Sequence, residues 1–208
     1  MVGQGILRES LLDPEVRKIL SVVRNPTGQR DEKLRELVHN NFWEFSDVEA
    51  ELSGFDACFF CLGITSAGMK EDDYRRVTYD ITMAAAKTLV KMNPNMTFVF
   101  VSGAGTDSTG QGRVMWARVK GKTENALLRL PFKAAYMFRP GIIQPLHGVT
   151  SKTKSYRILY TLMTPILSAL TLFPKVATTT EKLGRAMLAV AKNGYPKQIL
   201  ESSDINSI

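Results

Sequence analysis

The chain has 208 residues, of which 44% are hydrophobic and 23% are charged. This length suffices for one domain with a full hydrophobic core, and a second independent domain is not expected. The 27 Lys and Arg residues outnumber the 20 Asp and Glu residues, and the net charge of +7 suits an anionic small molecule, nucleic acid or membrane surface. Because no run of five or more basic residues occurs, the sequence argues against a nucleic-acid partner.

The first half of the sequence predicts short elements separated by polar turns. An apolar stripe over residues 6–12 predicts a helix that ends before Asp13 and Pro14. A long alanine-rich segment, 71–92, predicts a helix that ends before Asn93-Pro94. The other apolar runs predict strands over 18–23, 34–39 and 56–62 and a short helix over 48–52.

The only two cysteines, Cys58 and Cys61, lie in the predicted strand 56–62. Residues three apart in a strand point to opposite faces, so this pair cannot close on one ion. No second Cys or His pair completes a zinc site, and we expect no bound metal. Buried, reduced thiols and a start without signal-peptide character favour a cytoplasmic location.

The second half of the sequence repeats the alternation of strands and helices. Strands are predicted over 96–101 and 134–138, and helices over 116–130 and 181–192, the last of which stops at Asn193-Gly194. All predicted strands are apolar throughout, which is typical of a parallel sheet covered by helices on both faces. We therefore predict a doubly wound, Rossmann-like α/β fold.

One uncharged segment, 158–174, lies between Arg157 and Lys175. It falls just short of the ~18–20 residues that cross a bilayer as a helix, and Pro165 interrupts it. We expect a buried helix pair or a substrate lid here in preference to membrane contact, with a membrane-surface scaffold as the alternative. In this interpretation 142–180 is a substrate-side insertion within a single domain, 1–208.

Several short motifs, in this order and spacing, resemble the atypical short-chain dehydrogenase/reductases, NAD(P)-binding proteins related to epimerases. The nearest resemblance is to the Tat-interacting-protein-like group, and it covers essentially the whole chain. The motifs are Met1-Val2-Gly3-Gln4-Gly5, Val22-Val23-Arg24-Asn25-Pro26, Asp56-Ala57-Cys58-Phe59-Phe60-Cys61-Leu62-Gly63, Val101-Ser102-Gly103-Ala104-Gly105, Val119-Lys120-Gly121 and Arg139-Pro140-Gly141. The resemblance implies an NAD(P)-binding domain.

The start of the chain departs from the family pattern. A dinucleotide fold begins with a strand and a glycine turn, followed by a helix whose amino end holds the pyrophosphate. This chain passes directly from Met1 into its first helix, so the first strand and the two phosphate-facing glycines are missing, and Gly3 takes the place of the third glycine. We expect either a natural start upstream of Met1, which we prefer, or a form without part of its phosphate site.

The resemblance also implies contacts with the adenosine half of the cofactor. Arg24, after the predicted strand 18–23, occupies a position where an arginine pairs with a 2′-phosphate, so NADP(H) is expected and NAD is the alternative. Asn41 matches the position of an aspartate that contacts adenine. A loop-capping role for Asn41 is an equal alternative, and Asp47 is a second candidate for the adenine contact.

The nicotinamide half of the cofactor is assigned to other segments. By the same resemblance, Leu62 and Gly63 present their backbone to the nicotinamide ribose, and Lys120 binds that ribose. Pro140 and Gly141 form the loop on the cofactor side.

The catalytic residues implied by the resemblance are Ser102 and Lys120, but the usual tyrosine is replaced by Trp116. An indole N–H donates a hydrogen bond but does not release a proton near neutral pH, whereas general acid–base catalysis needs a group that titrates. We expect an NADP(H)-dependent oxidoreductase or epimerase-like enzyme acting on an unknown small carbonyl or hydroxyl compound. The alternative is a non-catalytic NADP(H)-binding sensor.

Two further residues are weaker candidates. Thr78 lies roughly where many relatives carry an asparagine of the proton relay. His147 follows Arg139-Pro140-Gly141 on a loop that borders the substrate pocket in relatives, where it could supply a proton. An exposed histidine without a catalytic role is the simpler interpretation of His147.

Overall fold

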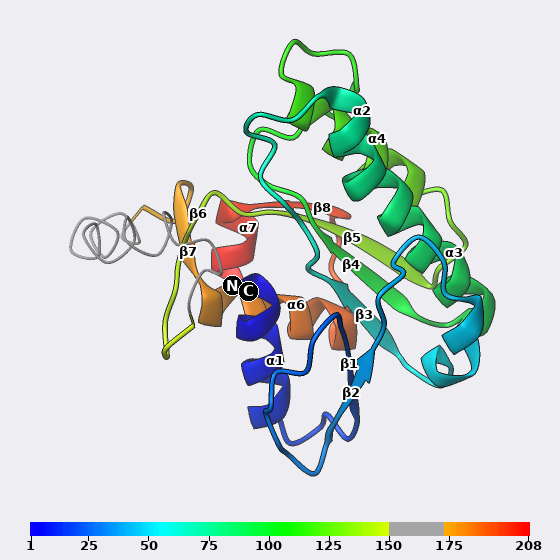
Figure 1. Cartoon of the computed structure of the whole chain (residues 1–208). Helices are drawn as coiled ribbons and strands as arrows, with labels where there is room; N and C mark the ends of the chain where they lie inside the picture. The colour runs from blue at the N-terminus through cyan, green and yellow to red at the C-terminus, as the bar shows by residue number, and fades with distance from the viewer. Residues whose placement is uncertain (150–172) are drawn as a thin grey trace.

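A computed structural model describes residues 1–149 and 173–208 (Figure 1). The strands in these ranges are β1 (Ile19–Val23), β2 (Leu34–Val38), β3 (Ala57–Phe60), β4 (Thr97–Val101), β5 (Ala134–Arg139), β6 (Ile142–Gln144), β7 (Ala177–Thr179) and β8 (Ile199–Glu201). They pair in parallel, as a four-stranded sheet in the order β3-β4-β5-β8 and two separate pairs, β1-β2 and β6-β7. The predicted parallel sheet is confirmed.

Helices cover both faces of the four-stranded sheet, with α2, α3 and α4 on one side and α1 and α6 on the other (Figure 1). The predicted helix 71–92 is continuous but contains a π-helical stretch. The helices are α1 (Val2–Leu12), the 3-10 helix η1 (Ser46–Leu52), α2 (Glu71–Arg75), the π-helix η2 (Arg76–Asp80), α3 (Ile81–Met92), α4 (Met115–Leu127), α6 (Thr180–Asn193) and α7 (Ser202–Ser207). The doubly wound α/β prediction is therefore confirmed.

Neighbouring residues of the central strands fill two different apolar layers. Phe98, Phe100 and Met137 are at most 1% exposed and pack on the side of α3 and α4. Val99 and Phe138 are fully buried against α6 on the opposite side. Because successive side chains of a strand point to opposite faces, burial on both faces requires strands that are apolar throughout.

The two cysteines contribute to different layers, as their spacing predicts. Cys58 packs against the layer of α3 and α4, and Cys61 against the layer of α6. Burial raises the pKa of both thiols to about 12. Both side chains are therefore protonated at neutral pH and act as small apolar groups.

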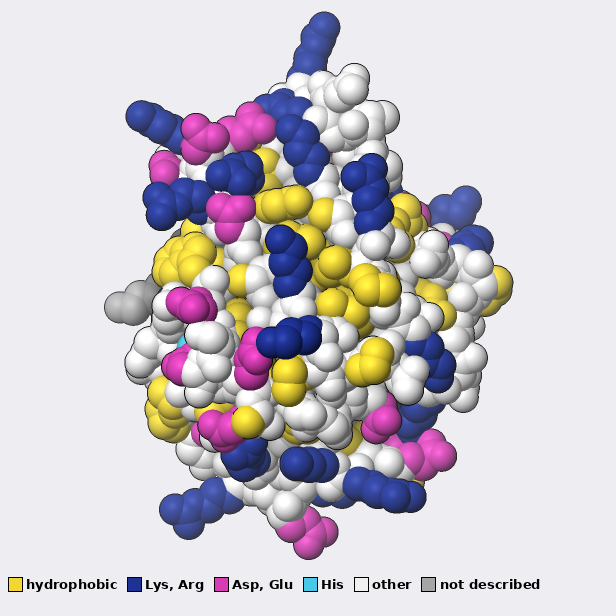
Figure 2. Space-filling model, turned by 90° about the vertical axis from the view of Figure 1, so that its right-hand side faces the viewer, with side chains coloured by type: hydrophobic (Ala, Val, Ile, Leu, Met, Phe, Trp, Pro, Cys, Tyr) yellow, Lys and Arg dark blue, Asp and Glu magenta, His cyan; other side chains and the backbone are white. Residues whose placement is uncertain are grey.

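Charged side chains of both signs surround apolar ones on the face at the right-hand side of Figure 1. Figure 2 shows Lys and Arg side chains on this face interspersed with Asp and Glu, and not gathered into one cationic patch. The expectation that the chain has no nucleic-acid partner stays a prediction.

The structure describes only part of the expected insertion 142–180. Residues 150–172, which include most of the uncharged segment 158–174, lie outside the described residues. The helix-pair and lid predictions for this segment therefore stay predictions. Among the described residues, no helix combines the length and the apolar character that a membrane crossing requires.

The strands β1 and β3 belong to two separate parallel sheets. Within the described residues β1 pairs only with β2 and β3 only with β4, so each has an edge without a strand partner. Leu20 and Val22 of β1 nevertheless pack against the same apolar layer as Phe60 of β3. The two sheets thus share an apolar core but no backbone hydrogen bonds. A strand between them would provide hydrogen-bond partners for the open edges of β1 and β3.

We predict that a five-residue apolar strand with a Gly-x-x-Gly turn, added ahead of Met1, raises the melting temperature by several degrees, because it satisfies two open edges at once. The matched control is an extension of equal length with proline at alternate strand positions, since proline cannot donate to a ladder. Thermal unfolding followed by circular dichroism measures both. Equal melting temperatures for the two extensions would contradict the prediction.

Candidate functional site

The carboxyl ends of β4 and β5 hold the residues that the sequence places at the site. The ladder between these strands continues past β4, because Ser102 N donates to the Phe138 carbonyl at 2.8 Å and Ala104 N to the Pro140 carbonyl at 2.9 Å. These bonds fix the backbone of the turn that follows β4. Ser102 is therefore held against β5 and is only 7% exposed.

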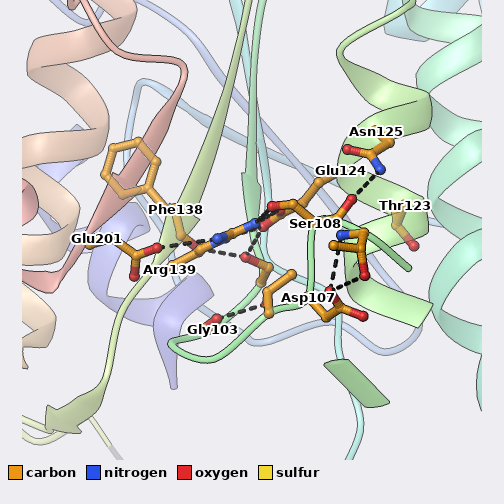
Figure 3. Close-up of polar contacts among 12 residues, drawn as sticks. Gly103, Asp107, Ser108, Thr123, Glu124, Asn125, Phe138, Arg139 and Glu201 are labelled. Atoms are coloured by element: carbon orange, nitrogen blue, oxygen red, sulfur yellow. Dashed lines mark hydrogen bonds and ion pairs between the residues drawn. The ribbon is translucent and has the colours of Figure 1, made fainter. Parts of the chain in front are cut away.

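A buried ion pair lies directly behind Ser102. The carboxylate of Glu124, on α4, has no exposed surface and accepts from Arg139 Nε at 3.0 and 3.2 Å and from its terminal nitrogen. Arg139 also donates to Glu201 at 3.2 Å and to Ser108 Oγ at 2.6 Å (Figure 3). The hydrogen bond with Glu124 raises the pKa of Arg139. Together these contacts join α4, β5, β8 and the loop after β4.

The hydroxyl proton of Ser102 is directed into this ion pair. Ser102 Oγ lies 2.5 Å from Glu124 Oε1 and 3.1 Å from the Phe138 carbonyl oxygen. A hydroxyl has one proton, and a carboxylate is a stronger acceptor than a carbonyl, so Ser102 donates to Glu124. In this arrangement Ser102 has only lone pairs left for another partner. Donation to a substrate carbonyl, as the resemblance implies, would require this bond to break.

Lys120 lies beside Ser102, as the resemblance implies. It is partly buried on α4, and its Nζ donates to the backbone carbonyl of Ser102. Burial lowers the pKa of Lys120 to about 8, against the opposing effect of the negative charge of Glu124. The structure thus brings Ser102 and Lys120 together. It does so through the serine backbone and not through its hydroxyl.

Trp116 is one helical turn before Lys120 and lies over the turn that follows β4. A Cβ atom at Gly105 would be 3.7 Å from Cη2 of the indole, so the ring covers this glycine in van der Waals contact. Gly105 has φ = +84°, a conformation that favours glycine. The indole of Trp116 therefore occupies the position of the usual catalytic tyrosine and packs on the backbone of Gly105.

The loop after β4 is fixed to α4 through Gly121. A Cβ atom at this position would be 1.7 Å from the carbonyl oxygen of Asp107, so only glycine allows the contact. Asp107 N donates to the carbonyl of Ala117 at 3.1 Å, and its carboxylate accepts from the backbone N–H of Gly112 at 2.6 Å. Hydrogen bonds from Thr109 and this N–H lower the pKa of Asp107. The sequence pattern did not predict this loop anchor.

Of the predicted cofactor residues, Gly63 and Arg24 are exposed, and Leu62 and Gly3 are partly buried. Gly63 is exposed beyond β3, and a Cβ atom there would meet nothing within 4 Å, while Leu62 beside it is partly buried. Arg24 is exposed after β1, and its side chain has no hydrogen bond or ion pair within the described residues. Gly3 lies in α1, where a Cβ atom would be 3.6 Å from Cys61, so it packs the helix onto the end of β3.

Asn41 has a structural role in its own loop. Its Oδ1 accepts from the backbone N–H of Trp43 at 3.3 Å, which is the loop-capping alternative. The other candidate for the adenine contact, Asp47, has its carboxylate 3.8 Å from Nδ1 of buried His39. Neither geometry is that of an unpaired acceptor.

Pro140 and Gly141 contact the protein itself. The Pro140 carbonyl accepts from Ala104, and Gly141 N donates to Ser202 Oγ at 2.7 Å. A Cβ atom at Gly141 would be 2.2 Å from the carbonyl oxygen of Val176. The glycine is therefore required for close packing of the chain ahead of β7.

The weaker candidates also have partners. His147 Nε2 lies 2.5 Å from Glu181, and this contact lowers the pKa of the carboxylate. Thr78 is buried in η2, and its carbonyl accepts from Thr82 at 2.5 Å. Its side chain is hydrogen-bonded with that of Tyr74, a phenol whose pKa is raised by burial.

No protein-family model matches the chain. Among curated proteins it is 30% identical to protein FMP52-2, mitochondrial, of Scheffersomyces stipitis over 145 residues, which are 69% of this chain and 62% of that protein. It is 28% identical to protein HTATIP2 of Rattus norvegicus over 148 residues, 68% of this chain and 58% of that protein. The chain thus spans about three fifths of the length of these relatives.

Solved structures share the fold at low sequence identity. The Bordetella bronchiseptica enzyme WbmF in complex with NAD+ superposes with a TM-score of 0.65 at 13% identity, over 99% of this chain and 73% of that one. DesIV of Streptomyces venezuelae, a dTDP-glucose 4,6-dehydratase with NAD and TYD bound, gives 0.64 at 14% identity, over 99% and 74%. Together with the curated relatives, these likenesses confirm the resemblance stated from the sequence.

The comparisons correct one expectation. Several FMP52 relatives carry the word mitochondrial in their names. These names contradict the expected cytoplasmic location. The two free thiols, on which that expectation rested in part, do not distinguish between reducing compartments.

The buried ion pair gives a prediction for stability. Arg139→Gln should lower the free energy of unfolding by about 3–5 kcal/mol, because the carboxylate of Glu124 would lose its cation while still buried. The matched control is Arg118→Gln, since Arg118 and Glu71 form a partly exposed pair whose loss leaves no charge buried. Urea denaturation measures both variants. Equal losses for the two would show that burial of the Arg139 pair carries no special cost.

Proposed function

We propose that this chain binds a nicotinamide dinucleotide and acts as an oxidoreductase on a small carbonyl or hydroxyl compound. It is a homologue of HTATIP2 and FMP52 and has the fold of NAD-binding epimerases and dehydratases, which is consistent with an atypical short-chain dehydrogenase/reductase. The observation that carries the proposal is the position of Lys120. Its amine is fixed at the end of β4, next to Ser102, in a fold that WbmF and DesIV use with NAD bound.

The residues at the carboxyl ends of the strands fit such a cofactor. Gly63 leaves open space for a ligand to approach the backbone, and Arg24 offers an unpaired cation within the described residues. The first turn of α1 holds no acidic side chain, so its partial positive charge is not neutralised there. In the proposed complex, Arg24 binds the adenosine side, and Gly63 and Lys120 bind the nicotinamide side.

The bound dinucleotide would supply hydride transfer to or from a carbon of the substrate. The chain must orient that carbon and exclude water. Trp116 supplies an apolar wall beside Lys120, since an indole does not exchange its proton near neutral pH. Ser102, which donates to Glu124, offers lone pairs to a donor group such as a substrate hydroxyl.

We propose NADP(H) as the preferred cofactor on the strength of Arg24. Arg24→Glu should weaken NADPH binding at least tenfold and change NADH binding by less than threefold, because only NADPH carries the 2′-phosphate. The control is Arg30→Glu, an exposed arginine in the same loop, which should affect both nucleotides equally. Titration calorimetry measures the affinities. A parallel loss of both nucleotides in Arg24→Glu would refute the preference.

A second function is favoured by one specific observation. Neither Trp116 nor Ser102 presents a proton that the standard mechanism could use, which suits a protein that binds NADP(H) and signals through partners without turnover. Mixing the protein with NADPH and a panel of aldehydes and ketones separates the two functions. Consumption of NADPH supports the oxidoreductase, and binding without consumption supports the sensor.

The replacement Trp116→Tyr tests the same choice from the opposite direction. It should leave NADPH affinity within a few-fold and raise any carbonyl reductase rate, because a phenol beside Lys120 would supply a titrating acid. The control is Trp116→Phe, which restores no acid and should not raise the rate. A large fall in affinity for both variants would show that the indole packs on the nucleotide.

A further inference from the structure

The proposed reduction of a carbonyl requires a proton, and the site does not take it from the usual residue. Trp116 occupies the tyrosine position and has no proton that exchanges in a useful range. The single proton of Ser102 is donated to the buried carboxylate of Glu124. Of the three side chains that the resemblance brings to this place, Lys120 alone carries a proton it can release and recover.

The geometry at Lys120 leaves part of its amine available. An ammonium group has three N–H donors, and only the donation to the Ser102 carbonyl is made within the described residues. The side chain is partly buried, and no second protein acceptor binds its Nζ within the described residues. The Ser102 carbonyl lies where β4 ends, next to the turn covered by Trp116. The free donors of Lys120 are therefore held at the place where the proposed substrate would react.

We propose that Lys120 is itself the proton donor and acceptor of this site. The inference rests on the proposed oxidoreductase function. In the reductive direction the carbonyl carbon accepts a hydride from the reduced dinucleotide, and the carbonyl oxygen takes a proton from the Nζ ammonium. The products are an alcohol, the oxidised dinucleotide and a neutral amine, which regains its proton from water.

The charges around Lys120 suit this role. Glu124, one turn further along α4, is the anion that favours its charged form, but that carboxylate is bound by Arg139 of β5, which also pairs with Glu201 of β8. Pairing with Arg139 weakens the attraction between the Glu124 carboxylate and the Lys120 ammonium. Burial of the amine then lowers the pKa of Lys120. The neighbouring α2 contributes Tyr74, whose buried phenol has a raised pKa and adds no charge near neutral pH.

The first test needs no cofactor. Protein labelled with 13C at Cε of lysine is titrated by NMR, and the signal of Lys120 is the one absent from Lys120→Met. We expect this signal to titrate near pH 8, below the ordinary pKa of a lysine side chain, and to persist in the exposed control Lys122→Met. Titration of Lys120 together with the other lysines would overturn the inference.

The second test separates proton transfer from charge. Lys120→Arg keeps a cation that can bind the nucleotide but does not release its proton. We expect NADPH affinity within about threefold of the native protein and a carbonyl reductase rate at least 100-fold lower. The reductive rate of the native protein should fall as the pH rises through the pKa measured for Lys120, because the ammonium form that donates the proton is then depleted.

The outcomes separate a failure of the proton-transfer role of Lys120 from a failure of the proposed oxidoreductase function. A reductase rate within tenfold of native in Lys120→Arg would overturn the inference and leave the oxidoreductase standing. Failure of the native protein to bind NADPH or NADH would overturn the proposed function instead. Binding without turnover of any carbonyl compound, together with an ordinary lysine titration, would reject the proton-transfer role and favour the sensor.

Discussion

The carboxylate of Glu124 and the guanidinium of Arg139 determine how the site is built. Both charges are removed from water, so each depends on the other and on the hydrogen bonds that satisfy their remaining groups. Ser102 and Ser108 supply two of these bonds, and Glu201 supplies a third contact at the edge of the network. A change in any one of these groups would disturb α4, two strands and the loop after β4 together.

This arrangement explains why the site differs from the one implied by resemblance. A serine at the end of β4 looks available for a substrate when only its position along the chain is known. Its hydroxyl is instead bound to a carboxylate one turn beyond Lys120, and the amine of Lys120 is bound to the serine backbone. The chemistry of the site then depends on the lysine, because the indole beside it does not titrate near neutral pH.

The sequence predicts the layers of the fold well because burial on both faces leaves a direct trace in apolar strands such as β4 and β5. It misses β6, β7 and β8, which have three residues each and are too short for any periodicity. Its motifs predict that Lys120 and Ser102 belong to one site, and the structure brings these two residues together. The sequence does not find Glu124, because a glutamate on a helix is normally a solvated residue, and only a fold that brings Arg139 opposite makes it a buried one.

The placement of the two thiols on opposite sides of the sheet has a practical consequence. Each is protonated at neutral pH and partly buried against its own layer, so an alkylating reagent reacts with it slowly in the folded chain and faster when that layer opens. Cys58 would report openings beneath α3 and α4, and Cys61 those beneath α6. The ratio of the two labelling rates would therefore measure whether the halves of this divided core loosen independently or as one cooperative unit.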